Sequence, residues 1–563
     1  MHAEQHHQLK LRPPDEVMRL DRLGAAFPTR LSFLRAMLRR VKADGWQFSR
    51  PVFAIDNEGF GHAVYQADTP DGPLSLVAFS TELAPEQRTD RVIAEAWDTS
   101  YVLFDGVPSA ADIARLSGNV PRQEAGRYSP RELVLSRANK SMRLFEKVVA
   151  TLERGQQPDS GELASVGYLM RTTAVYGNGK FGIADRGQLL DRDALRGPFR
   201  AEMLTVWLIR TFTIDLAEQV ARMRAPGTAV PLAPELRRLL GVGNSTGLGM
   251  APFLVRHPAL LDRWITAKET ALARVRALPR CDAPVAAALR GLIPNMKQQL
   301  ANWQTDDQGY SQRIRELQHD LNAIGEAIKA GALDLDLPFD RLITWAASTL
   351  SLDGRELLVS LLLEPHGELI DDLSDQMDAD ETRTFVIDGS STINSLRAAI
   401  RTRYGFVTEH DFTDQREQAR FWYTSSAKLE PRLGERFQEA GEDLEQPLGI
   451  ARDIAALDAD LWAVDPEMSV AAFLARSPEH RHVVRRVLGL VDHAYGEISG
   501  NLLSGRMRPI DMLRAKLAFF GATRFDPRSD RWLRITLFQG APFPHELADG
   551  PADDWMFASG AAG

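Results

Sequence analysis

The chain has 563 residues, of which 44% are hydrophobic and 25% charged, and its 67 basic and 76 acidic residues give a formal net charge of -9. The length exceeds what one ordinary hydrophobic core serves, and the composition is that of a folded protein, so we expect two to four domains packed together. The acidic balance excludes a global positive field that would attract phosphates, and we expect no nucleic-acid partner.

Cysteine content and hydropathy indicate where the protein works. The single cysteine, Cys281, excludes an internal disulfide and a multi-cysteine zinc site, which fits a reducing cytoplasm. Residues 1–20 lack the apolar stretch of a secretory signal, and the apolar run 357–363 is far too short to cross a bilayer. We therefore expect a cytoplasmic protein without a membrane partner.

The first part of the chain predicts a flexible tail followed by a mixed region. Residues 1–30 are the expected tail, and an α+β portion follows over 31–128. Four short runs with strand periodicity, separated by Gly, Asp and Pro, predict a small antiparallel sheet; they are 52–56, 62–67, 74–80 and 101–106. Apolar residues recurring at three and four predict helices over 86–98 and 129–155.

Helical spacing dominates the remainder. We expect a helical region over 129–365, in which 199–223 is apolar on most sides and is predicted to be a buried core helix. Further helices are predicted over 259–278, 284–304, 310–330, 394–402, 414–428, 466–476, 479–497 and 507–520. The region 366–563 is expected to be mostly helical, with a small strand element where 384–400 reads as strand, turn and helix. The predicted fold class is predominantly α with an N-terminal α+β portion, in several domains.

A glycine-rich stretch at 241–250 is the strongest candidate for a binding site. Glycines let a ligand approach the main chain, and a helix beginning near Ala251 would aim free amide hydrogens at an anion. The candidate binding residues are Gly243, Asn244, Ser245, Thr246, Gly247, Gly249 and Arg256, with His257 as a candidate catalytic group. A connector between two helices, with a glycine C-cap, is the alternative. No lysine follows the glycines and no strand is predicted before them, so neither a Walker A loop nor a dinucleotide fingerprint is present.

A second glycine-rich stretch, 170–187, surrounds Lys180 with polar groups. We predict that Arg171 and Asn178 bind a small acidic substrate and that Lys180 or Tyr176 moves a proton. An ordinary Asn-Gly hairpin turn is the alternative. On the helix 199–223, the candidate wall residues of the site are Glu202 and Arg210; a structural salt bridge is the alternative for buried charges there.

These patterns favour an enzyme that binds a small carboxylate- or phosphate-bearing metabolite and performs proton-transfer chemistry, such as elimination or isomerisation. The alternative is a helical interaction or scaffold protein in which both glycine-rich stretches are turns. The distance between the two stretches separates the hypotheses, since only the enzyme requires them to meet. The cofactor is unknown, because a flavin can bind without a short motif. The sequence leaves open whether the chain forms a homo-oligomer.

Overall fold

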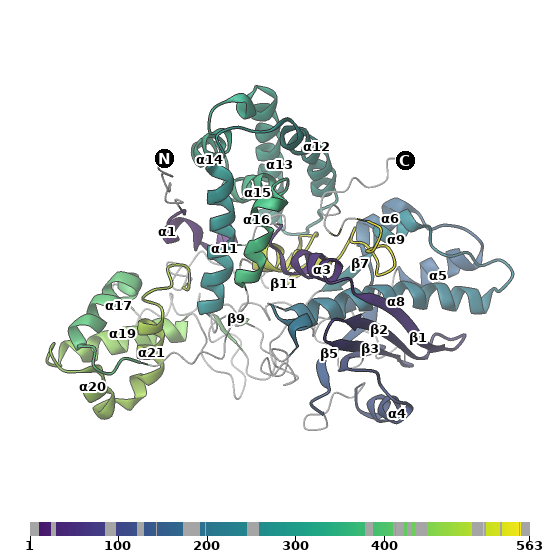
Figure 1. Cartoon of the computed structure of the whole chain (residues 1–563), viewed down its shortest axis with the longest axis horizontal. Coiled ribbons are helices and arrows are strands. Elements are labelled where there is room, and N and C mark those ends of the chain that lie inside the picture. Colours follow the sequence, from purple (N-terminus) through teal and green to yellow (C-terminus); the bar gives the residue numbers. More distant parts are fainter. Residues whose placement is uncertain are drawn as a thin grey trace, which may run out of the picture.

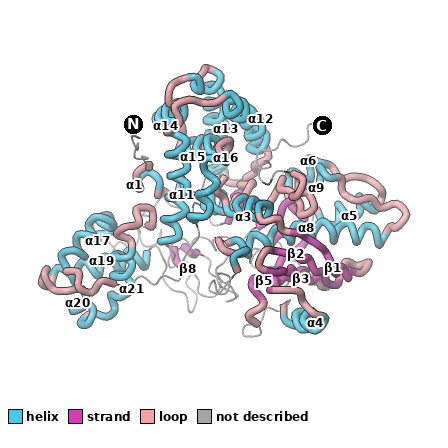
Figure 2. Tube along the Cα trace, viewed as in Figure 1, coloured by secondary structure: helices cyan, strands magenta, loops and turns pink. Residues whose placement is uncertain are grey.

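A computed structural model of the chain describes residues 11–23, 30–84, 97–120, 129–141, 144–172, 192–197, 199–244, 258–377, 387–408, 411, 422–424, 431–433, 448–497, 511, 514–529, 532–550 and 552. Figure 1 shows a sheet backed by the long helix α8, a group of helices from α11 to α16 rising above it, and a further helical group from α17 to α21 at the left. Figure 2 shows how the strands gather in one part of the molecule while helices make up the rest.

The sheet has nine strands in the order β1-β2-β3-β4-β5-β6-β7-β11-β10. They are β1 (Gln47–Ile55), β2 (Gly61–Thr69), β3 (Gly72–Ser80), β4 (Thr99–Asp105), β5 (Glu132–Lys140), β6 (Tyr168–Thr172), β7 (Gly241–Asn244), β10 (Asp526–Ser529) and β11 (Trp532–Leu537). Among the described strand pairs β6 and β7 run parallel, and the others are antiparallel. The four predicted strands are confirmed as an antiparallel meander, but the expectation of a small antiparallel sheet is wrong, because the sheet is large and mixed.

Strand β5 replaces part of a predicted helix. Residues 129–155 have helical spacing, yet the structure has β5 first and the helix α5 only over Phe145–Glu153. Val134 and Leu135 are both buried, on opposite faces of the sheet, in two different hydrophobic clusters. A strand buried on both faces reads as a continuous apolar run, and pairing with β4 and β6 decides its conformation.

The sheet is covered on both faces. Helix α8 (Arg200–Arg224) lies on one face and contacts the strands from β3 to β7, which confirms the predicted core helix 199–223. Its Phe212 ring packs edge-on against Tyr65 and Tyr101, with ring centroids 6.3 and 5.7 Å away. On the other face Val102 and its neighbours pack against Leu116 of α4 (Ala110–Asn119).

The upper helices belong to the same hydrophobic cluster as the α8 face of the sheet. They are α11 (Pro258–Arg276), α12 (Ala283–Ala301), α13 (Gln308–Lys329), α14 (Pro338–Thr349), α15 (Leu352–Leu363) and α16 (Gly367–Ile370). The predicted helices 259–278, 284–304 and 310–330 are confirmed. Short segments complete this part of the fold: α1 (Pro14–Val17), α2 (Leu20–Leu23), α3 (Phe33–Ala43), α6 (Ser160–Val166), α9 (Pro234–Arg238) and α23 (Ala515–Phe519).

The left-hand helices in Figure 1 enclose a separate hydrophobic cluster. They are α17 (Ile393–Thr408), α19 (Leu448–Trp462), α20 (Val470–Arg476) and α21 (Arg481–Gly489). Helix α17 confirms the predicted helix 394–402, whereas the strand expected at the start of 384–400 falls mostly outside the described residues. Within the predicted helix 414–428 the described residues form strand β8 (Trp422–Thr424), paired with β9 (Pro431–Leu433), so the helix is wrong there.

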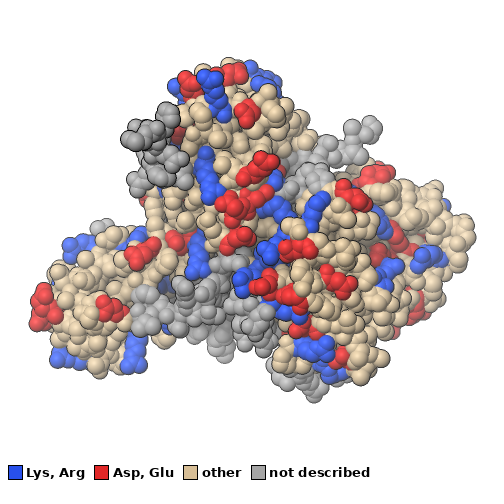
Figure 3. All heavy atoms as spheres, in the orientation of Figure 1, with Lys and Arg blue, Asp and Glu red and all other residues tan. Residues whose placement is uncertain are grey.

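On the face drawn in Figure 3, basic and acidic side chains are interspersed over the helices and the sheet region. Within the described ranges, no helix combines the length and the hydropathy needed to cross a bilayer.

Candidate functional site

The first residues of the two glycine-rich stretches lie side by side in the sheet. Strand β6 ends at Thr172 and β7 at Asn244, and these two residues are register partners, as are Arg171 and Gly243. Because the pair is parallel, both strands end at the same edge of the sheet. Ligands of open sheets bind beyond the carboxyl ends of parallel strands. The first residues of the two stretches therefore have the adjacency that the enzyme hypothesis requires.

Packing explains the glycines inside β7. A Cβ at Gly243 would lie 2.7 Å from the ring of Tyr168, and one at Gly241 would lie 2.2 Å from the carbonyl oxygen of Leu537. Side chains do not fit at such distances, so both positions need glycine whether or not a ligand binds. Gly243 thus has a packing role, and a backbone cradle for a ligand must rest on the residues after it.

The charges of three arginines and one carboxylate act on the phenol of Tyr168, the first residue of β6, whose ring lies against Gly243 near the end of β7. Tyr168 is 4% exposed, and this burial raises the pKa of its phenol. The charges of Arg534, Arg171 and Arg524 lower that pKa and the charge of Asp526 raises it, but burial has the largest effect and the net pKa is raised. The phenol therefore keeps its proton at neutral pH. Its hydroxyl has no hydrogen-bond partner among the described residues, so it remains able to donate to a bound group.

Strand pairing places the arginines at the site. Arg534 of β11 pairs with Asp526 of β10, and it adjoins Ile535, the register partner of Asn244. Arg534 therefore lies on β11 close to the point where β7 ends. Arg524 donates from Nη1 to the carbonyl oxygen of Ala164, at 2.9 Å. Guanidinium groups match carboxylate and phosphate oxygens geometrically, so the cluster suits an anionic group.

A cleft adjoins the cluster, and Arg524 belongs to both. The cleft has a volume of about 500 Å³ and lies between α6, α9 and α12, with residues 523–524 and 539–540 completing its lining. Small-molecule sites commonly have volumes of about 300 to 1,000 Å³, so it is large enough for a metabolite.

Comparison with known proteins adds no assignment to this geometry. The chain matches no family, no curated protein and no solved structure. Within the described part of the chain, no group of three or more His, Cys, Asp or Glu side chains is arranged to hold a metal ion. The side chains and their positions are therefore the basis for assigning a function.

Several predicted site residues cannot be placed. Tyr176, Asn178, Lys180, Ser245, Thr246, Gly247, Gly249, Arg256 and His257 lie outside the described residues, and only the backbone of Asn244 is described. Arg171 and Gly243 are the predicted residues that the structure brings together.

The buried charged side chain of α8 whose partners are known, Arg210, stabilises the packing of the helix. Arg210 donates to the carbonyl oxygens of Leu240 and Ala541, at 2.6 and 2.7 Å, and its guanidinium lies 3.9 Å from the centroid of the Phe543 ring. Burial, followed by repulsion from other arginines, lowers the pKa of Arg210 to about 9. This side chain fastens the residue before β7 to the C-terminal segment. Glu202 is buried in the first turn of α8.

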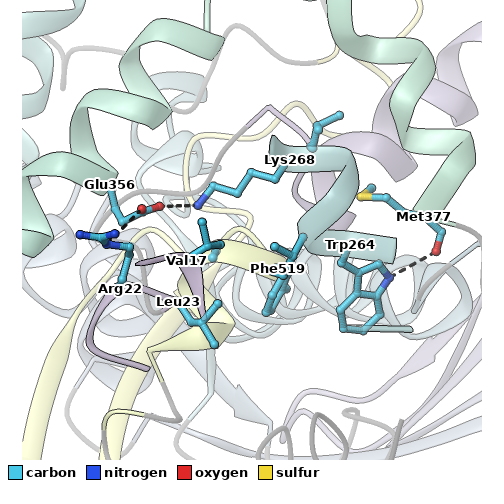
Figure 4. A pocket seen from close by; sticks show the side chains of 11 residues that line it. Val17, Arg22, Leu23, Trp264, Lys268, Glu356, Met377 and Phe519 are labelled. Carbon is cyan, nitrogen blue, oxygen red and sulfur yellow. Dashed lines mark hydrogen bonds and ion pairs between the residues drawn. The ribbon is translucent and has the colours of Figure 1, made fainter. Parts of the chain in front are cut away.

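Sequence reasoning missed a buried ion network centred on Glu356 of α15, and Figure 4 shows the part of it formed by Glu356, Lys268 and Arg22. Lys268 of α11 donates to Glu356 at 2.6 Å, and Arg12 donates to it at 3.1 Å. Arg12 also forms a bidentate pair with Glu269, at 2.6 and 2.8 Å, and Arg22 lies 3.8 Å from Glu356. The cavity beside the network has a volume of about 20 Å³, which suits a single water and no metabolite.

The function of this network is to anchor the N-terminal segment. Arg12 and Arg22 come from residues 11–23, whereas their carboxylate partners lie on α11 and α15, so the ion pairs tie the start of the chain to the upper helices. Partners separated by 257 and 344 positions leave no local signal in the sequence. Isolated charges on helices read as solvated faces, which is why the network was not anticipated.

Proposed function

We propose that the protein is an enzyme that binds a small carboxylate- or phosphate-bearing metabolite where β6 and β7 end, and that it transfers a proton on that metabolite, as in an elimination or isomerisation. One observation carries the proposal: the parallel pair puts the starts of both glycine-rich stretches near Tyr168, a buried phenol on which the charges of Arg171, Arg524 and Arg534 act. The cluster holds three guanidinium groups and one carboxylate among the described residues.

In this proposal, the residues that the structure describes bind and orient the metabolite. Arg171 and Arg534 hold the anionic group through charge-assisted hydrogen bonds, which are shorter and stronger than neutral ones. The protonated phenol of Tyr168 donates a further hydrogen bond. Burial strengthens these contacts, because Arg171 is only 5% exposed and its charge is little screened by water.

The residues that follow the strands supply the chemistry in the same proposal. Lys180, Tyr176 or His257 acts as acid or base, and Arg256 with the backbone amides after Gly243 stabilises developing negative charge. Proton transfer needs no nicotinamide, and the cofactor stays open. We place the protein in the cytoplasm because it has a single cysteine, and we expect no nucleic-acid partner because its net charge is -9.

A helical scaffold protein is the second candidate. It is favoured by the close packing at Gly241 and Gly243, which accounts for two of the four glycines of the first stretch without any ligand. The arginines whose charges act on a phenol that has no hydrogen-bond partner among the described residues count against it, because that arrangement suits an anionic ligand.

Titration of the purified protein with small anions separates the two candidates. The probes are inorganic phosphate, citrate, malate and 3-phosphoglycerate, followed by calorimetry and thermal melting. We expect at least one to bind, with an affinity that falls as sodium chloride is raised, and we expect Arg171→Lys to weaken binding by about 10-fold because the bidentate fork is lost. Arg290→Lys, on the exposed side of α12, is the matched control. Lack of binding by all four anions, or equal binding by the Arg171 variant, would favour the scaffold.

A further inference from the structure

The side chains that line the cleft of about 500 Å³ are mostly of a different kind from those of the anion site. Helix α12 forms one wall, and α6 and α9 form the other. Clefts between packed units of structure are frequent ligand sites. The character of the side chains on these walls indicates which ligand fits.

A row of amide side chains lines the wall formed by α12. Asn295, Gln298, Gln299 and Asn302 recur at three and four, which places them on one face of the helix. Each primary amide donates two hydrogen bonds and accepts others. The side-chain amides of Asn295, Gln298 and Asn302 have no hydrogen-bond partner among the described residues, so they are available to a ligand.

The opposite wall is held in place by its own hydrogen bonds. Thr523 donates from Oγ1 to Oε1 of Gln539 at 3.1 Å, and Gln539 donates from Nε2 to the carbonyl oxygen of Leu239 at 3.0 Å. Arg238 pairs with Glu546 at 3.1 Å, so its charge is balanced. This wall therefore presents fixed hydrogen-bonding groups, and its lining carries charges of both signs, which include Glu235 and Arg524.

We propose that this cleft binds a neutral carbohydrate. Each hydroxyl group of a sugar both donates and accepts, which is the pattern that the amides of α12 match. An apolar ligand would leave those amides without partners, at a cost in free energy. The indole of Trp303, just after α12, borders the cleft but is only 9% exposed and packs against the ring of Phe525, so the amides are the groups that face a ligand.

A peptide fits this cleft less well. Extended peptides gain affinity by adding a strand to the edge of a sheet. The lining residues 523–524 and 539–540 lie just outside strands β10 and β11, and the other walls are helical. The carbohydrate site adjoins the proposed anion site and shares Arg524 with it, but its amide wall on α12 is separate, so sugar binding does not require anion binding.

The test is binding of neutral saccharides to the full chain, measured by saturation-transfer NMR and calorimetry. The panel contains mono-, di- and trisaccharides of glucose, galactose, mannose, xylose and N-acetylglucosamine, with trialanine as the peptide probe. We expect at least one saccharide to bind with little dependence on sodium chloride, because no charge pairing is involved. The double substitution Asn295→Ala with Gln298→Ala should weaken that binding by about 10-fold or more.

The substitutions are chosen to preserve the fold. Alanine has the highest helix propensity, so α12 should remain intact, and thermal melting verifies this. Gln308→Ala removes an exposed amide outside the cleft and should leave binding unchanged. Asn302→Ala, at the end of the same face, is the second variant if the double substitution lowers the melting temperature. Absence of saccharide binding, equal binding by the α12 variants, or binding of trialanine alone would overturn the proposal.

Discussion

The ring of Tyr168 lies against the backbone of Gly243 across the parallel strand pair, close enough that a Cβ at position 243 would come within 2.7 Å of it. The opposite end of the same side chain, its hydroxyl, lies among Arg534, Arg171 and Arg524. One residue therefore fixes the approach of two strands and presents a polar group where they end. The same contact therefore contributes to stability and to the proposed binding site.

The first prediction concerns the packing at this contact. Gly243→Ala should destabilise the protein by about 1–3 kcal/mol, because the added methyl group cannot fit beneath the Tyr168 ring without moving a strand. Chemical denaturation monitored by circular dichroism measures the change. Gly291 of α12 is the control, since a Cβ there meets nothing within 4 Å. Gly291→Ala should be neutral or stabilising by about 0.5–1 kcal/mol. Equal effects at both glycines would show that the ring does not require a bare backbone.

The sequence predicted the parts of the fold whose signal is local. The meander over β1 to β4 has short alternating runs between turn residues, and α8 has uninterrupted helical spacing over its 25 residues. Strand β7 has no such signal, because Gly241 and Gly243 lower strand propensity and the pairing with β6 and β11 comes from segments far along the chain.

The same limit applies to the candidate site. Arg171 was identified because it lies beside a glycine-rich stretch, whereas Arg524, Arg534 and Tyr168 have no local feature that distinguishes them from surface or core residues. They come together because β10 and β11 extend the sheet beyond β7. Long-range strand pairing of this kind is set by tertiary structure, and one sequence does not reveal it.

The second prediction concerns the buried ion network. Glu356→Gln should destabilise the protein by about 3–5 kcal/mol, because Lys268 would remain buried without its carboxylate and Arg12 would keep only Glu269. Denaturant titration at neutral pH measures the loss. Glu326→Gln breaks an exposed ion pair with Lys329 and should have no measurable effect, because water and salt screen that pair. A small effect at Glu356 would mean that the N-terminal segment separates readily from α15.

The third prediction is a dependence of stability on acid pH. Burial raises the pKa of Glu356, but Lys268 and Arg12 outweigh it, and the pKa falls from 4.5 to about 2. Because the folded state holds the carboxylate in its charged form, its contribution is complete above pH 4.5 and is lost as the pH falls towards 2. The difference in unfolding free energy between wild type and Glu356→Gln should therefore shrink over that interval. A difference that stays constant from pH 6 to pH 2 would assign the acid sensitivity to other carboxylates.

The last prediction separates the two roles of Tyr168. Tyr168→Phe keeps the ring over Gly243, so the melting temperature should change little, but it removes the hydroxyl that lies among the arginines. Affinity for the anion found by titration should fall about 3- to 10-fold, the effect of one lost hydrogen bond. Tyr65→Phe should show the reverse pattern, because the Tyr65 hydroxyl donates to Asp215 at 2.7 Å and supports the packing of α8 on the sheet. It should lower stability and leave anion binding unchanged. If Tyr168→Phe instead lowered stability as Tyr65→Phe does, with affinity intact, the phenol would be a packing group and the anion would have to bind elsewhere.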